Sequence, residues 1–471
     1  MQYIVYDKHD GSILLIKKGG SVKITVDSAK SMFEGKDVGV WKMEDRILSV
    51  KNNKIALDKN GDPRGIIIYE GVKEYEIDDF GKKNVNAKKI VYKGVFYDHG
   101  GYANMNREIA LRLAKMEDVD LRVEIVPSGK QIDNLTFEKL NYLSKKNIPA
   151  SGSVNIVGFT PMGTDVSNFN IFFTMMETQT LHPDFANVCN RYADAIMTPT
   201  MWNKDVFLKG GIRRPIHVVP LGVSTDIYKP GVPKLPIQCR ELPSGKLENK
   251  FPSFNYITLF GWSYRKGIDV ILKSYCDRFT SKDDVGFIIC SRYMGGSDKK
   301  QKRIVERDIL GFMKNYSDPP RVYYYGESTP IESMPNLMAN GDCFIWGSRG
   351  EGFGLPIIEA ASMGIPVVST YNSAMTDFLT EDNSFIVHTD KFVTAPRNIT
   401  CISPYYVGQL FPELGDSVIK KFGERMREVY DNYSLAERKA SVFSSQIKEK
   451  YTWDICAKNV YKVLKKIEKG S

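Results

Sequence analysis

Histidine is scarce in this chain, and its cysteines are scattered. There are five histidines and seven cysteines among 471 residues, and no two cysteines form a C-x-x-C pair. Structural zinc sites and redox pairs need such spacing, so neither is expected. Dispersed thiols of odd number are typical of reduced, mostly buried side chains in a cytoplasmic protein. They are Cys189, Cys239, Cys276, Cys290, Cys343, Cys401 and Cys456.

Long apolar runs are also lacking. No stretch reaches the length that crosses a bilayer, so no transmembrane segment is expected. Asp7, Lys8 and Asp10 interrupt the first apolar stretch, which argues against a signal peptide. The composition, 42% hydrophobic and 26% charged, is that of an ordinary soluble globular protein. A length of 471 residues predicts two or three domains.

The formal net charge is +9, and the basic residues gather in the stretches 82–89, 299–303 and 462–466. This excess favours anionic ligands or partners, such as sugar nucleotides, lipid phosphates, a membrane surface or nucleic acid. The plainest interpretation of the clusters is solvated protein surface. Peripheral membrane contact through them stays open.

Residues 1–89 predict a small antiparallel β accessory domain. Short apolar segments alternate there with turn residues, including Asn52-Asn53 and Asn60-Gly61. No catalytic pattern stands out among them. The expected strands are residues 3–6, 13–17, 22–26, 38–43, 47–50, 55–58 and 66–69.

From residue 90 onward, apolar strands alternate with amphipathic helices, which predicts an α/β fold with doubly wound parallel sheets. We expect one Rossmann-like domain over residues 90–250 and a second over 251–425. Helices over 426–471 are expected to pack back on the first of these. Prolines punctuate residues 222–252, which we interpret as an interdomain linker or extended loop. Ligands should bind at the carboxyl ends of the strands, between the two domains.

Glu351 and Glu359 carry the clearest chemical signal. The first lies in a glycine-rich loop after the apolar strand 343–346, and the second lies in the helix that follows. Pro356 suits the first turn of that helix. A helix start behind a glycine loop is an anion site, commonly for diphosphate, and a carboxylate on the helix can accept hydrogen bonds from ribose hydroxyls. Helix capping alone would explain one of these acids but not both. The pattern therefore indicates a nucleotide-sugar donor site.

Four stretches resemble the retaining glycosyltransferases of family 4 (glycosyl transferases group 1), which have the GT-B fold. Residues 351–368 resemble that family's E-x7-E signature with the helix and strand beyond it, and residues 260–267 resemble its first C-domain strand and basic loop. The end of its first domain is matched by residues 199–207 with 218–223, and its first glycine loop by residues 100–102. The likeness covers roughly residues 90–470. The E-x7-E stretch is quite specific in this context, whereas the glycine loop alone is a weak signal. Many members have an arginine directly after the glycine, where this chain has Trp262.

The resemblance implies metal-independent transfer of a sugar, a hexose by expectation, from a nucleoside diphosphate to an acceptor hydroxyl. The configuration would be retained, and the sugar nucleotide would be a co-substrate, with no metal or other cofactor. Fixed cations can stabilise the leaving diphosphate. The catalytic candidates are Arg265, Lys266 and Glu351. The candidate donor-binding residues are Glu359, Gly352, Phe353, Gly354, Leu355, Gly261 and Gly326. The candidates for an acceptor or phosphate loop are Gly100, Gly101, Tyr102, Glu177 and His182.

Other interpretations stay open. A nucleotide-sugar epimerase or a phosphorylase shares the two-domain plan. A non-catalytic protein that binds glycans or nucleic acid could use the same scaffold, and so could a transferase that modifies nucleic acid. Asp118 and Asp120 fit a metal-binding D-x-D pattern, but they precede a strand, so we take the match as fortuitous. The sequence does not specify the donor base, the sugar, or whether the acceptor is a glycan, a lipid-linked sugar, a protein or nucleic acid.

Overall fold

A computed structural model divides the chain into two compact units, residues 1–76 and 77–471. It describes residue 80, residues 83–128, 132–293, 298–389, 391–400 and 403–468, and five strands before residue 56. The domain boundary expected at residue 89 falls inside the second unit, whose first strand, β6, already begins at Lys88. None of the described helices is both long and apolar enough to cross a lipid bilayer.

The first unit contains antiparallel strands. Strand β1 (Gln2–Asp7) pairs with β2 (Ile13–Lys18) on one side and with β3 (Val38–Met43) on the other. Strands β4 (Val50–Lys51) and β5 (Lys54–Ile55) form a hairpin around the predicted Asn52-Asn53 turn. The strands expected at residues 22–26 and 66–69 lie outside the described residues, as do most of those expected at 47–50 and 55–58.

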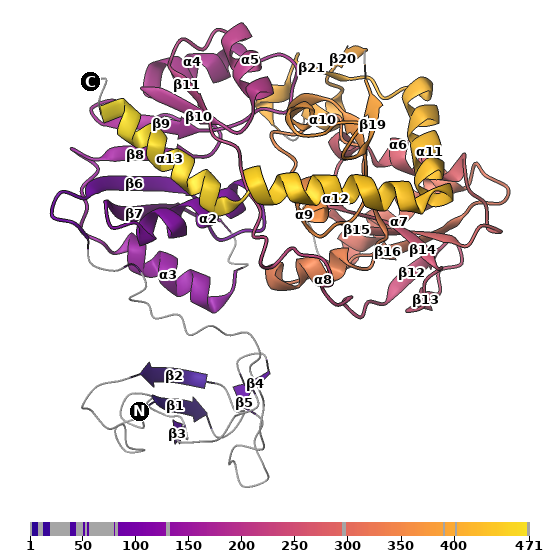
Figure 1. Ribbon diagram of the computed structural model, residues 1–471, viewed down its shortest axis with the longest axis horizontal. Coiled ribbons are helices and arrows are strands. Elements are labelled where there is room, and N and C mark those ends of the chain that lie inside the picture. Colours follow the sequence, from indigo (N-terminus) through magenta and orange to yellow (C-terminus); the bar gives the residue numbers. More distant parts are fainter. Residues whose placement is uncertain are drawn as a thin grey trace. The chain divides into compact units, whose positions relative to one another are not determined.

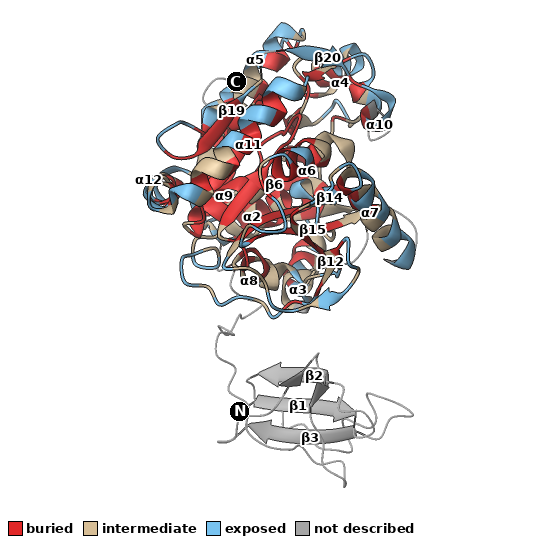
Figure 2. Ribbon diagram, turned by 90° about the vertical axis from the view of Figure 1, so that its right-hand side faces the viewer, coloured by how far each residue is buried: buried red, intermediate tan, exposed pale blue. Residues whose placement is uncertain are grey.

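The first half of the second unit is a parallel sheet of six strands in the order β11-β10-β9-β8-β6-β7. Its strands are apolar and largely buried because helices cover the sheet, as Figure 2 shows in red against the paler helices. The strands are β6 (Lys88–Val95), β7 (Val119–Val126), β8 (Val154–Gly158), β9 (Phe169–Phe173), β10 (Ala195–Thr198) and β11 (Ile216–Val218). The helices are α2 (Gly101–Lys115), α3 (Asn134–Ser144), α4 (Pro183–Tyr192) and α5 (Met201–Lys209).

The second half is an eight-stranded sheet in the order β13-β12-β16-β15-β14-β17-β18-β19. Its six parallel strands follow the Rossmann order, and the two remaining strands extend one edge. The parallel strands are β14 (Phe254–Trp262), β15 (Val285–Tyr293), β16 (Arg321–Tyr325), β17 (Cys343–Trp346), β18 (Val367–Tyr371) and β19 (Phe385–His388). The helices between them are α6 (Ile268–Cys276), α7 (Asp298–Met313), α8 (Met334–Met338) and α9 (Leu355–Ser362).

The prediction that residues 222–252 form an interdomain linker or extended loop was wrong where two short strands occur. Strand β12 (Cys239–Leu242) pairs antiparallel with β16, and β13 (Leu247–Glu248) pairs with β12 at the sheet edge. Backbone pairing defines these edge strands, and they are too short to show an alternating apolar pattern. Prolines remain compatible with them because they lie outside the paired residues.

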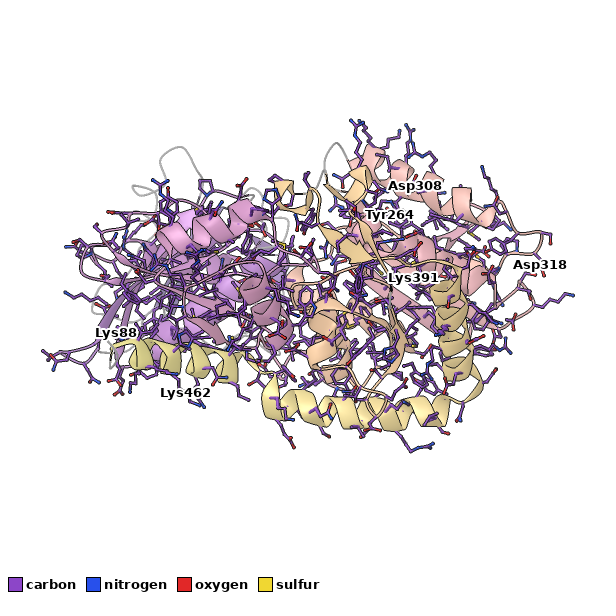
Figure 3. All side chains as sticks on the ribbon, turned by 90° about the horizontal axis from the view of Figure 1, so that it is seen from above. Lys88, Tyr264, Asp308, Asp318, Lys391 and Lys462 are labelled. Carbon is purple, nitrogen blue, oxygen red and sulfur yellow. The ribbon has the colours of Figure 1, made fainter. Side chains whose placement is uncertain are left out.

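Three helices complete the chain: α11 (Asp416–Asp431), α12 (Tyr433–Lys450) and α13 (Trp453–Glu468). Figure 1 shows α12 and α13 in yellow, passing from the second half to the first. There α13 packs on α2, and Arg112 Nε donates a 2.7 Å hydrogen bond to Asp454. Lys88, labelled in Figure 3, reaches the Leu464 carbonyl at 2.9 Å. The C-terminal helices therefore tie the two halves together.

Candidate active site

The site lies where the strand order of the second sheet reverses. Strands β14 and β17 are neighbours there, although two strand–helix repeats separate them in the sequence. Beyond β14 comes the short 3-10 helix η1 (Tyr264–Lys266), which carries Arg265 and Lys266. Beyond β17 comes the glycine loop 347–354, which leads into α9. A reversal of this kind is the usual ligand position in open α/β sheets, and it brings together all three predicted catalytic residues.

Arg349 fastens the two loops to each other. Its guanidinium makes two hydrogen bonds to the Asp269 carboxylate, at 2.9 and 2.6 Å, and lies 3.7 Å from the ring centre of Tyr264, which Figure 3 labels. Its backbone N–H donates to the Arg265 carbonyl at 2.8 Å. Planar, bidentate contacts of this kind hold geometry tightly. The positions of Arg265 and Lys266 are therefore coupled to the glycine loop.

Glu351 is the centre of a buried ion cluster. Its Oε1 lies 2.6 Å from Lys266 Nζ and 3.3 Å from Arg265 Nη1, and the residue is only 7% exposed. The Lys266 ammonium also lies 4.7 Å from the ring centre of Trp346, a favourable cation–π contact. The Glu351 carboxylate thus lies between the cations of Lys266 and Arg265, where another anion could also bind.

These contacts shift the ionisation of all three groups. Burial disfavours the Glu351 carboxylate, but Lys266 and Arg265 outweigh it, so the pKa of Glu351 lies below its usual value. Burial and the neighbouring Arg265 lower the pKa of Lys266 to about 8. Burial alone would lower the pKa of Arg265, yet Glu351 raises it above the usual value. At pH 7 the cluster therefore carries a net positive charge suited to a phosphate.

Arg265 has an unused donor in this cluster. Its Nη1 donates to the Gly350 carbonyl, but its Nε is buried and has no hydrogen-bond partner among the described residues. Buried donors are nearly always satisfied in folded proteins, so such a group commonly indicates a missing ligand or water. An anionic oxygen beside Arg265 would supply the partner.

The glycine loop faces the first half directly. A Cβ atom on Gly350 would lie 2.1 Å from the Glu177 carbonyl oxygen, and one on Gly352 would lie 2.4 Å from Met175. Asn203 Nδ2 donates to the Gly352 carbonyl at 2.8 Å. The loop therefore lies at the boundary between the halves, where it is closely packed against the first half.

Glu177 links the first half to the cation pair. It follows β9, and its carboxylate accepts a hydrogen bond from Tyr406, which lies in a crossing segment of residues 391–400 and 403–412. The backbone of this crossing segment bonds to the first half, where Gln179 N donates to the Leu410 carbonyl at 2.9 Å. The negative charge of Glu177 favours the charged forms of Arg265 and Lys266. Glu177 therefore brings a negative charge of the first half to the cation pair.

Glu359 lies on α9, with Glu108 of α2 nearby. Burial first, and then repulsion from Glu108, raise the pKa of Glu359 to about 7. No ion pair or hydrogen bond to the Glu359 carboxylate occurs within the described parts of the chain. An unpaired carboxylate with a raised pKa is a common feature of binding sites.

The remaining donor-side candidates have mixed environments. Gly354 has φ +101° and caps α9, a conformation that favours glycine. Phe353 packs on Phe378 and Tyr451, so its side chain belongs to the core. Gly261 pairs with Arg292 across β14 and β15, whereas Gly326 is closed in by the Tyr324 hydroxyl. Leu355 is the first residue of α9 and is buried.

The predicted acceptor or phosphate-loop residues of the first half also lie in different environments. Gly100 and Gly101 are exposed at the start of α2, and Tyr102 bonds through its hydroxyl to Thr174 and to the Met175 N–H, both at 3.1 Å. His182 caps α4 by accepting from the Asp184 N–H at 3.2 Å. No contact joins His182 to the cluster around Glu351 in the described structure.

Three further residues around the site were not among the predicted site residues. Trp262, noted above as a departure from the family pattern, is buried and donates to Asp308 at 3.1 Å. Ser373 accepts from the Glu351 N–H at 2.9 Å and has φ 48°, unusual for a residue other than glycine. Its place just beyond β18, at the same sheet edge as Glu351, could have marked it. Tyr406 lies too far along the chain for any local pattern to connect it with Glu177.

A comparison with protein families identifies the second half. The family model described as "Glycosyl transferases group 1" matches residues 253–400, which include both loops of the ion cluster and the E-x7-E stretch. This stretch is similar to the glycosyl transferases group 1 domain. The matched stretch contains Arg265, Lys266, Glu351 and Glu359, and the expected resemblance to glycosyl transferases group 1 is confirmed.

Curated relatives and solved structures agree with this assignment. The lipopolysaccharide core biosynthesis mannosyltransferase LpsB of Rhizobium meliloti is 26% identical over 180 residues, and the match covers 37% of this chain and 47% of that protein. A putative glycosyltransferase of Sulfolobus islandicus filamentous virus is 24% identical over 368 residues, or 76% of this chain and 87% of its own length. This chain therefore matches only about half of the length of LpsB.

The solved structure of Anabaena HepE in complex with UDP and glucose has a TM-score of 0.56 and 13% identity. It covers 80% of this chain and 100% of its own length. Sucrose-phosphate synthase from Thermosynechococcus elongatus also has a TM-score of 0.56, with 12% identity, 82% coverage of this chain and 100% of its own. These likenesses confirm the predicted GT-B fold of two Rossmann-like domains facing across a cleft.

Proposed function

We propose that this protein is a retaining, metal-independent glycosyltransferase that moves a hexose from a nucleoside diphosphate sugar to an acceptor hydroxyl. The observation that carries the proposal is the ion cluster at the reversal of the second sheet, where Lys266 and Arg265 hold the Glu351 carboxylate in front of α9. The names of the mannosyltransferase relative and of the UDP and glucose complex support a sugar nucleotide as donor.

The residues divide the work of such a reaction. Lys266 and Arg265 stabilise the negative charge that develops on the departing diphosphate, helped by the N–H groups at the start of α9. Glu359 accepts hydrogen bonds from the ribose hydroxyls. Glu351 holds the cations in place before the donor binds and contacts the sugar afterwards. Glu177 approaches from the first half, where the acceptor would lie.

Donor turnover tests this proposal. The protein is incubated with GDP-, UDP- and ADP-hexoses and candidate acceptors, with and without EDTA, and the free nucleoside diphosphate and the glycoside are measured. We expect both products in equal amounts, unaffected by EDTA, with the donor's anomeric configuration kept in the glycoside. Absence of nucleoside diphosphate release from every donor would overturn the proposal.

The pH dependence of donor use should form a bell. Because the pKa of Glu359 is raised to about 7, its carboxyl group is protonated below that pH and accepts ribose hydroxyls less well. Because the pKa of Lys266 is lowered to about 8, its ammonium loses its proton above that pH. We expect kcat/KM for donor hydrolysis to be greatest between pH 7 and 8 and to fall about tenfold per pH unit well outside this range.

Two variants test which residue causes the loss of activity on each side of the pH optimum. Glu359→Gln should flatten the acidic limb, and Lys266→Arg, which cannot lose its proton in this range, should flatten the alkaline limb. A profile whose limbs both persist in the two variants would refute these roles.

A further inference from the structure

A second feature of the cleft lies apart from the ion cluster. A cavity of about 390 Å³ opens between the two halves, at the carboxyl ends of strands from both sheets. His99, which follows β6, and Asp133, which follows β7, line it from the first half. Residues 328–332, which follow β16, line it from the second.

The position of this cavity fits one part of a nucleotide donor, and this step rests on the proposed function. The diphosphate would lie beyond β14, and β16 is two strands away from β14 in the same sheet. Neighbouring strands are about 4.8 Å apart, so the two loops are separated by about 10 Å along the sheet edge. A ribose and a base extend over about that distance from a diphosphate. The cavity is therefore placed for the base.

The described wall of the cavity carries two carboxylates, those of Glu332 and Asp133. Glu332 is exposed in it, and its carboxylate has no hydrogen bond or ion pair within the described residues. Asp133 uses Oδ1 to cap α3, accepting from the Thr136 N–H at 2.8 Å. Among the described residues that line the cavity there is no lysine or arginine. An ionised carboxylate only accepts hydrogen bonds, so this wall favours a base edge rich in donors.

Guanine and uracil differ most at that edge. Guanine presents N1–H beside its N2 amino group, two adjacent donors that match the two oxygens of one carboxylate. Uracil presents a single N3–H between two carbonyl oxygens, which an adjacent carboxylate would repel. We propose that this cavity holds the donor base and that Glu332 makes the protein select guanosine diphosphate sugars over uridine diphosphate sugars.

His99 is consistent with a base in this place. Burial and the charges of Arg107 and Arg292 lower the pKa of His99, against the opposing effects of Asp98 and Glu332. The ring is therefore neutral at pH 7, and a neutral imidazole can stack on the face of a base.

Calorimetric titration of the full-length protein with GDP, ADP and UDP tests the proposal. We expect GDP to bind about tenfold to a hundredfold more tightly than UDP, because hydrogen bonds to a charged group carry this difference. Glu332→Gln should reduce the preference for GDP over UDP to less than about threefold, mainly by weakening the binding of GDP. Glu327→Gln is the matched control, because it removes a neighbouring exposed carboxylate that pairs with Lys302 and does not line the cavity. It should keep the preference.

Each other outcome has a distinct meaning. Equal or tighter binding of UDP to the unmodified protein would overturn the base assignment while leaving the transferase proposal intact. A preference for GDP that persists in Glu332→Gln would show that Glu332 does not determine which base is bound. Failure of all three nucleotides to bind would instead contradict the proposed function itself.

Discussion

Replacing Lys266 with alanine is expected to lower the turnover number for donor hydrolysis roughly 100- to 1,000-fold. Lys266 lies 2.6 Å from Glu351 in the buried cluster, where its ammonium is held before the donor arrives. Removing one fixed donor that stabilises charge in a transition state commonly has an effect of that size. The loss should appear mostly in kcat, because charge on the diphosphate develops as the sugar departs.

Lys273→Ala is the control for this substitution. Lys273 lies on α6 in the same half, is 45% exposed, and pairs with Asp416 at 2.9 Å on the surface. Exposed pairs of this kind contribute little, so activity should stay within about twofold of the unmodified protein. If Lys266→Ala keeps more than about a tenth of the activity, the diphosphate is not stabilised by Lys266 in the manner we describe.

Gly267→Ala is expected to destabilise the second unit by about 3 kcal/mol or more and to abolish donor binding. Gly267 has φ +69°, and a Cβ atom there would lie 1.8 Å from the Gly347 carbonyl oxygen. The Cβ atom is fixed to its own backbone and its clash partner is a backbone oxygen, so a side-chain rotation cannot relieve the clash. The substitution must push η1 away from the glycine loop, which separates Lys266 from Glu351.

Gly245→Ala is the control that distinguishes the effect of this clash from the effect of backbone strain alone. Gly245 has φ +75°, but nothing lies within 4 Å of the position of its Cβ. Its cost should be about 1 kcal/mol, from the left-handed conformation alone. Thermal unfolding of both variants gives the comparison. Equal thermal midpoints would mean that the contact between Gly267 and Gly347 does not constrain the site.

The local elements around the site could be predicted from the sequence because each has its own pattern. The apolar strand 343–346, the glycines after it and Pro356 specify a strand, a loop and a helix start without reference to the rest of the chain. The alternation of strands and helices likewise predicted parallel sheets. These signals placed Lys266 and Glu351 at the same sheet edge.

The contacts between distant segments could not be predicted. The ion pair of Lys266 with Glu351 joins loops that are 85 residues apart, and its geometry depends on the packing of both sheets. The hydrogen bond of Tyr406 to Glu177 depends on the crossing segment, whose apolar residues pack on the first half and show no helical or strand period. Strand β12 was missed because it forms by pairing with β16, which lies more than one strand–helix repeat later in the sequence.

The central claim is that a diphosphate binds between Lys266, Arg265 and the first turn of α9. A crystal structure of the protein with a bound nucleoside diphosphate tests it most directly. We predict phosphate oxygens within hydrogen-bond distance of Lys266 Nζ and Arg265 Nε, with the α9 N–H groups pointing at them. A diphosphate bound at any other part of the cleft, with Lys266 still paired only to Glu351, would contradict the account.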